Sequence, residues 1–126
     1  MCENHIRILE YDVMETYKLQ SKLFKALMHP VRLAILDCLR EGEQCVCHLE
    51  AHLGYRQAYI SQHLMVLRDA GLVSDRKDGW NSYYKVVQPE IYQVIDAAIQ
   101  LTDPGAASLP LHVNSTGAAC PCPKCS

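Results

Sequence analysis

Apolar residues recur at intervals of three and four along most of the chain, which is the spacing of one face of an α-helix. The first such run covers residues 6–27. His29-Pro30 interrupts it, because the residue before a proline disfavours helical geometry and proline itself suits the first turn of a new helix. A second helix is therefore predicted over residues 31–40, with Gly42 as its C-terminal stop.

Two shorter helices are predicted in the middle of the chain. The first covers residues 47–53 and is closed by Gly54, and the second covers residues 57–70 and is closed by Gly71. Only Gly54-Tyr55-Arg56 separates them, which is the spacing of a helix-turn-helix.

A change from helical periodicity to strand-forming residues follows directly. Residues 72–76 and 82–87 read as strands around a turn that contains Asp78-Gly79, a strong hairpin signal. Pro89 then opens a last amphipathic helix over residues 90–101. The predicted fold is mainly α with a β-hairpin wing, that is, a winged helix-turn-helix.

Composition divides the chain into one folded domain, residues 1–102, and a flexible cysteine-rich tail, residues 103–126, which is rich in small residues and proline. No apolar run is long enough to cross a membrane, and the first residues are too acidic for a signal peptide. We therefore expect a cytoplasmic protein without a membrane partner. In that compartment, seven cysteines indicate metal binding, redox sensing or burial rather than a disulfide framework.

A helix-turn-helix followed at once by a hairpin predicts binding to double-stranded DNA. The second helix of such a unit fits the major groove, and the hairpin contacts the backbone. The formal net charge is −2, yet residues 56–86 hold five basic residues against three acidic ones. The candidate DNA-contacting residues are Arg56, Gln57, Tyr59, Ser61, Gln62 and His63 on the helix, and Arg76 and Lys77 on the hairpin.

Three linked segments resemble the ArsR/SmtB family of metal-responsive repressors: residues 25–36, residues 45–49 and residues 60–73. The resemblance covers about half of the chain. It implies a dimeric winged helix-turn-helix protein, a homodimer joined by the first and last helices, that occupies an operator until an inducer weakens binding. It also implies that Cys45 and Cys47 occupy an inducer-binding position.

The chemistry of this thiol pair depends on the local backbone. Residues two apart point to nearly opposite sides of a helix, but to the same side of an extended segment, where Cys45 and Cys47 can share a ligand. A helix N-terminus favours thiolate, the form that binds soft metals. Two thiols are too few, because arsenite or antimonite needs about three and zinc or cadmium about four. In the arsenic sensors of the family, a third cysteine stands where this chain has Glu50. The zinc site on the family's last helix is ruled out, because residues 90–101 contain no histidine and only Asp96 as a spaced carboxylate.

The missing ligands are sought among the remaining cysteines. Cys120, Cys122 and Cys125 are our first choice, with Cys2 in reserve. The alternative is a cysteine-rich tail without a role. Cys38, within an apolar run, reads as an ordinary core thiol.

The leading hypothesis is a repressor, with no enzymatic activity and no organic cofactor, that is released by As(III), Sb(III), Cd(II), Pb(II) or Zn(II). A redox or persulfide sensor of the same fold is the alternative. A thiol oxidoreductase or metal carrier that uses Cys122-Pro-Lys-Cys125 is more distant, because no βαβ pattern accompanies the motif.

Overall fold

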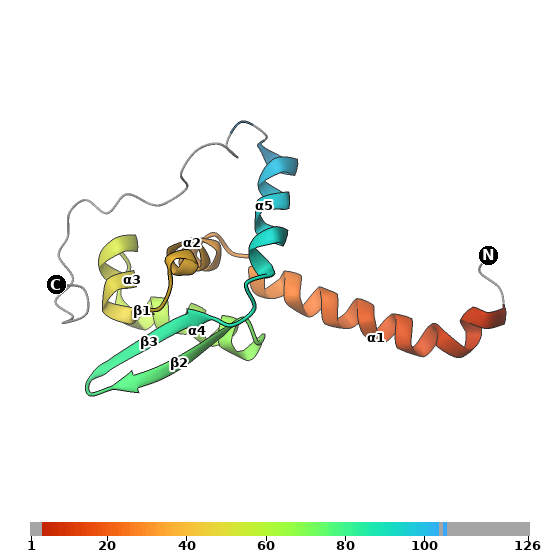
Figure 1. Ribbon diagram of the computed structural model, residues 1–126, viewed down its shortest axis with the longest axis horizontal. Coiled ribbons are helices and arrows are strands. Elements are labelled where there is room, and N and C mark those ends of the chain that lie inside the picture. The colour runs from red at the N-terminus through yellow and green to blue at the C-terminus, as the bar shows by residue number, and fades with distance from the viewer. Residues whose placement is uncertain (1–3, 104, 106–126) are drawn as a thin grey trace.

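The computed structural model describes residues 4–103 and 105, with side-chain environments from residue 12 onward. In chain order the elements are α1 (Asn4–Leu27), α2 (Pro30–Cys38), the 3₁₀ turn η1 (Leu39–Glu41), β1 (Gln44–Cys45), α3 (Val46–Leu53), α4 (Gln57–Asp69), β2 (Val73–Asp78), β3 (Asn81–Val86) and α5 (Ile91–Thr102). This order confirms the predicted winged helix-turn-helix fold. Figure 1 shows α1 extending away from the other elements on one side and the β2–β3 hairpin, the wing, extending on the other.

The helix boundaries follow from local chemistry. His29 is the N-cap of α2, and its Nδ1 accepts a hydrogen bond from the backbone N–H of Val31 at 3.1 Å. Gly54 closes α3 at φ 77°, a left-handed conformation that favours glycine. At the tip of the wing, Gly79 has φ 65°, which suits the first central position of a two-residue hairpin turn.

The core lies where α2, α3 and α4 meet beneath the sheet. Six side chains there are 0% exposed, namely Ile35, Leu36, Leu49, Ile60, Leu64 and Leu67. The last three of these repeat along α4 at the predicted helical spacing. One face of α4 is thereby fixed to the core, so the opposite face of this second helix of the helix-turn-helix is turned outward.

The wing belongs to a three-stranded antiparallel sheet in the order β1-β3-β2. The sequence predicted β2 and β3 but not β1, which is two residues long and immediately precedes α3. In β1, Gln44 lies opposite Tyr84 and Cys45 lies opposite Tyr83. The segment that enters the helix-turn-helix is therefore paired to the wing by backbone hydrogen bonds.

Two side-chain contacts connect α5 to α2 and to the 3₁₀ turn η1 that follows it. The hydroxyl of Tyr92 donates a hydrogen bond to the backbone carbonyl of Leu36 at 2.6 Å, and burial raises the pKa of Tyr92 to about 12. Arg40 forms an ion pair with Asp96 and lies 4.5 Å from the ring centroid of Tyr92. Asp96, the carboxylate considered for a zinc site on this helix, is thus bound to Arg40. Among the described residues, no helix is both long and apolar enough to cross a lipid bilayer.

Candidate nucleic-acid interface and thiol site

The first two turns of α4 present a polar outer face. Arg56 is the N-cap in an extended conformation, and Arg56, Gln57, Tyr59 and Gln62 are exposed, while Ser61 is half-buried. The rings of Tyr55 and Tyr59 are in tilted contact, with centroids 5.1 Å apart and an interplanar angle of 48°, which holds the side chain of Tyr59 beside the helix start. This arrangement places hydrogen-bonding groups where a major-groove helix needs them.

His63 differs from the sequence-based expectation that it faces DNA. Its side chain is 8% exposed, its ring centroid lies 4.3 Å from that of His29, and its Nδ1 lies 3.1 Å from Nη1 of Arg32. Because a guanidinium only donates, Nδ1 accepts, and the proton of the neutral ring resides on Nε2. That buried nitrogen has no hydrogen-bond partner among the described residues. Burial, together with His29 and Arg32, lowers the pKa of His63, which favours the neutral ring, and the side chain packs against His29 and Arg32.

Arg32 joins three elements through one guanidinium. Besides contacting His63, it donates from Nε to the carbonyl of Ala26 at 2.6 Å and from Nη2 to the carbonyl of Lys25 at 3.3 Å. Both carbonyls belong to the last turn of α1, where helix carbonyls lack intrahelical partners. Arg32 therefore fixes the end of α1 and the middle of α4 to α2.

The two predicted wing residues have different environments. Both residues are exposed, and the side chain of Arg76 is 50% exposed. Arg76 is also held in place, because its Nε and Nη2 donate to the two carboxylate oxygens of Glu43 at 2.9 and 2.8 Å. Its guanidinium lies 4.6 Å from the ring centroid of Tyr83, so this side chain lies against the sheet.

Trp80, at the tip of the wing, was not among the residues predicted to contact DNA. Its side chain is 102% exposed. It follows Gly79 in the two-residue turn between Asp78 and Asn81. The sequence signal was the single tryptophan of the chain beside an Asp-Gly turn, where an apolar side chain has no core to enter.

Cys45 and Cys47 lie at the junction between β1 and α3. Cys45 is extended, with φ −81° and ψ 157°, and serves as the N-cap of α3, and its Sγ accepts a hydrogen bond from the backbone N–H of His48 at 3.2 Å. Cys47 already lies in the first turn of the helix. The two Cα atoms are 5.3 Å apart, and the structure joins the two sulfurs in a disulfide.

The surroundings of the thiol pair are asymmetric. Cys45 is 1% exposed and packs against Tyr83 of β3, which is 4% exposed, whereas Cys47 is half-buried at the edge of this cluster. A ligand or oxidant can therefore reach the sulfur of Cys47, while the buried sulfur of Cys45 is in contact with strand β3 of the wing.

The other candidate ligands fall into two groups. Cys38 is 6% exposed, and burial, with Asp37 and Glu41, raises its pKa to about 11, which confirms a core thiol. Cys2, Cys120, Cys122 and Cys125 lie outside the described residues. Within those residues, no group of three or more potential ligands of the histidine, cysteine and carboxylate types is assembled.

Comparisons with known proteins identify similar chains. Residues 29–75 match the family model described as bacterial regulatory protein, arsR family. An uncharacterised HTH-type transcriptional regulator of Methanocaldococcus jannaschii is 41% identical over 90 residues, which are 70% of this chain and 100% of that protein. The arsenic resistance transcriptional regulator ArsR1 of Pseudomonas putida is 42% identical over 79 residues, or 62% of this chain and 61% of that one.

A solved structure has the same architecture. The homodimeric winged helix-turn-helix DNA-binding domain of Mycobacterium bovis superimposes with a TM-score of 0.65 at 26% identity, covering 73% of this chain and 85% of that chain.

Proposed function

The chain belongs to the ArsR family of bacterial regulatory proteins and is a transcriptional regulator rather than an enzyme, and on this premise we propose that it is a repressor released from its operator by a thiophilic ion. The thiol oxidoreductase alternative is not carried forward, because the family consists of regulators. The proposal has three parts: a DNA-reading face, a dimer interface and a sensing site.

The DNA-reading face consists of α4 and the tip of the wing. Arg56, Gln57, Tyr59, Ser61 and Gln62 face the major groove, where arginine pairs with guanine or phosphate and glutamine with adenine. Lys77 contacts the phosphate backbone beside the groove. His63 and Arg76 are left out of this set, because His29 and Arg32 cover the histidine and Glu43 holds the arginine.

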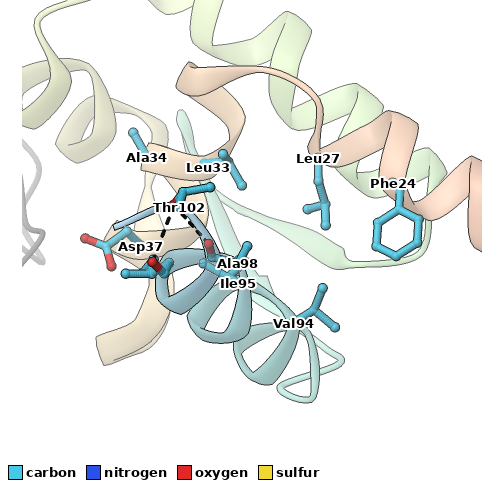
Figure 2. Close-up of a pocket in the computed structure, with 10 residues that line it drawn as sticks. Phe24, Leu27, Leu33, Ala34, Asp37, Val94, Ile95, Ala98 and Thr102 are labelled. Atoms are coloured by element: carbon cyan, nitrogen blue, oxygen red, sulfur yellow. Dashed lines mark hydrogen bonds between the residues drawn. The ribbon is translucent and has the colours of Figure 1, made fainter. Parts of the chain in front are cut away.

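The dimer interface is formed by α1 and α5. Figure 2 shows side chains of α1, α2 and α5, most of them apolar, that line one cavity. Its volume is about 450 Å³. It is lined by Phe24, Leu27, Leu33, Ala34, Asp37, Val94, Ile95, Ala98, Ile99 and Thr102. Phe24 is 54% exposed and Leu101 at the end of α5 is 86% exposed. Contact of this apolar surface with water is unfavourable, and a second copy of the chain that covers it removes that contact. A homodimer also presents two α4 helices to successive major grooves, as operator recognition requires.

The sensing site is centred on Cys45 and Cys47. One observation carries this assignment: the two sulfurs lie within bonding reach of each other at the point where the segment paired to the wing becomes the first helix of the helix-turn-helix. A soft ion that binds both thiolates changes the geometry of this junction. The similar Pseudomonas putida protein is an arsenic resistance regulator, which supports an ion of the arsenite class. Further thiolates come from Cys120, Cys122 and Cys125, with Cys2 in reserve, since two thiolates alone do not complete the coordination of As(III), Sb(III), Cd(II), Pb(II) or Zn(II).

Release requires only a modest free-energy coupling between the sensing site and the DNA-reading face. A coupling free energy of about 1–3 kcal/mol lowers operator affinity by roughly 5- to 150-fold. Small displacements of α4 are sufficient, because both half-sites must be engaged at a fixed spacing.

The proposal is tested by thiol substitution in the full-length chain. We expect Cys45→Ser and Cys47→Ser to bind an operator duplex, selected in vitro from a random pool, but to remain bound when As(III) or Cd(II) is added. Serine at position 45 keeps an oxygen acceptor for the N-cap bond to the N–H of His48. Cys38→Ala, which removes a core thiol, is the matched control and should still be released. Release of both serine variants at the wild-type ion concentration would contradict the assignment.

A second function is favoured by the disulfide between Cys45 and Cys47. In this reading the repressor senses oxidants: two thiols lose two protons and two electrons to a peroxide, which is reduced to water and an alcohol or to two waters, and one S–S bond forms. A persulfide donor acts similarly: the two thiols and two persulfide molecules give one trisulfide link between the cysteines, one hydrogen sulfide and two thiols of the spent donor. Mass spectrometry of the operator-released protein separates the cases, because oxidation removes two hydrogens, a polysulfide link adds sulfur, and ion binding leaves the thiols intact after chelation.

A further inference from the structure

One transverse row of the sheet joins the thiol pair to the wing. Tyr83 on β3 lies opposite Cys45 on one side and opposite Arg76 on the other. Directly opposed residues of antiparallel strands place their side chains on the same face. The contacts agree with this, because Cys45 packs against Tyr83 and the guanidinium of Arg76 lies 4.6 Å from the centroid of the same ring.

Glu43 connects the two ends of this row, because it precedes Cys45 on the thiol segment and binds Arg76 on β2. It lies two residues before Cys45 and accepts two hydrogen bonds from Arg76, at 2.8 and 2.9 Å. In the order β1-β3-β2, the strand that carries Arg76 does not touch β1. The Glu43–Arg76 pair is therefore a second connection between the thiol segment and the wing, in addition to the backbone pairing, and it spans the whole width of the sheet.

The side chains of Cys45 and Tyr83 are tightly packed, so a movement of one of them displaces the other. Cys45 is 1% exposed and Tyr83 is 4% exposed, and close-packed interiors transmit strain because they lack voids. The fork of Arg76 fixes direction as well as distance, since two parallel hydrogen bonds to one carboxylate define a plane. A new bond at the sulfur of Cys45 therefore moves Tyr83 or the β1 segment, and either movement reaches Arg76.

We propose that Glu43 and Arg76 are positioning residues that transmit the state of Cys45 and Cys47 to the wing. This inference rests on the proposed sensing role of the thiol pair and adds to it that release acts through the wing as well as through α4. In this role Arg76 is an internal connection of the repressor, and its charge is committed to Glu43 instead of to DNA phosphate.

The chain contains its own reporter of wing position. Trp80 is the single tryptophan and lies at the wing tip, 102% exposed. Its fluorescence anisotropy and quenching by iodide report the wing, while thiolate-to-ion absorption in the ultraviolet reports loading of the cysteines. Operator affinity, measured in parallel with a labelled duplex, reports release. All three signals come from the full-length reduced protein with As(III) as the ion.

Two variants weaken the connection and one is a matched control. Glu43→Gln removes the charge of the acceptor and one acceptor oxygen, and Arg76→Lys keeps the positive charge but loses the fork. Asp78→Asn removes an equal charge from a second, longer contact of Arg76 at 3.8 Å, without touching the thiol segment. We expect Glu43→Gln and Arg76→Lys to reach wild-type thiolate absorption. The ratio of operator Kd with As(III) to operator Kd without it should fall by roughly 2- to 30-fold in both variants. The change in Trp80 anisotropy and iodide quenching on adding As(III) should become smaller. Asp78→Asn should keep the wild-type ratio and response.

The outcomes separate this inference from the proposed function. Wild-type protein that shows thiolate absorption with none of the five ions, As(III), Sb(III), Cd(II), Pb(II) and Zn(II), contradicts the sensing role itself. Full absorption together with a wild-type release ratio and Trp80 response in Glu43→Gln and Arg76→Lys overturns the wing connection alone. A changed operator affinity without ion at an unchanged ratio also overturns it, because the pair then only supports the fold.

Discussion

Replacing Arg32 with methionine tests whether one guanidinium fixes α1, α2 and α4 to each other. Methionine keeps most of the aliphatic stem but loses all three hydrogen bonds. Two of these are part-buried, at 2.6 Å to the carbonyl of Ala26 and 3.1 Å to Nδ1 of His63, while the exposed one to Lys25 is longer, at 3.3 Å. A hydrogen bond of a charged group contributes about 1.5–3 kcal/mol when it is shielded and little when it is exposed. With the lower figure for each part-buried bond, the expected loss is about 3 kcal/mol.

The assay is urea denaturation at fixed protein concentration, followed by circular dichroism. A loss of this size lowers the urea midpoint without changing the dependence of the unfolding free energy on urea concentration. In a thermal scan it lowers the melting temperature by roughly 10–15 °C. Arg68→Met is the matched control, because among the described residues the one ion pair of Arg68 is a partly exposed contact with Asp75 at 3.6 Å. This substitution should change stability by less than about 0.5 kcal/mol. An equally small effect of Arg32→Met would refute the reasoning.

Three further predictions concern pH, DNA binding and assembly. Burial and its neighbours lower the pKa of His63, so its contribution to stability is present above the unfolded pKa of about 6.5 and is lost as the pH falls through the lower folded value. His63→Gln should therefore lose less stability than the wild type between pH 7 and pH 5 in urea titrations, and parallel losses would refute this. Lys77→Ala should reduce the salt dependence of operator binding by about 0.9 per protomer, and an unchanged slope would place Lys77 away from the DNA phosphates. Phe24→Asp places a carboxylate at the apolar cavity and should give monomers in sedimentation velocity, and a persisting dimer would place the interface elsewhere.

Most of the fold was predictable because its signals are local. Pro30 and Gly54 mark helix ends, and the core stripe of α4 has a clear helical period. The Asp-Gly pair at residues 78–79 marks the turn of the wing. Each of these features depends on a few neighbouring residues, so a single sequence is sufficient to recognise it.

The parts that were missed depend on contacts distant in sequence. The strand β1 exists because Cys45 meets Tyr83, and two residues carry no periodicity of their own. The polar character of His63 suggested exposure, yet the residue is buried against Arg32. Arg76 is exposed, but Glu43 binds its guanidinium, and both partners lie more than thirty positions away in the sequence. A polar residue on a DNA-binding element reads the same from sequence whether it faces DNA or a neighbouring helix.

The candidate sensing site was predictable in part. The extended backbone at Cys45, which allows the two sulfurs to approach, was expected from the position of the pair at a helix entry. Its contact with Tyr83 was not expected, because it arises from the register of the sheet. The cysteines of residues 120–125 remain a prediction for the completion of the site.

The central claim is that loading of the Cys45–Cys47 pair is the event that releases the operator. The most direct measurement is a titration of the reduced, operator-bound full-length protein with As(III), Sb(III), Cd(II), Pb(II) and Zn(II), in which thiolate absorption and release are followed in the same cuvette. The account predicts that, for at least one ion, the two signals rise together with the same stoichiometry and are lost together in Cys45→Ser. Release by these ions without thiolate absorption, or full absorption in wild-type protein that stays bound to the operator, would contradict it.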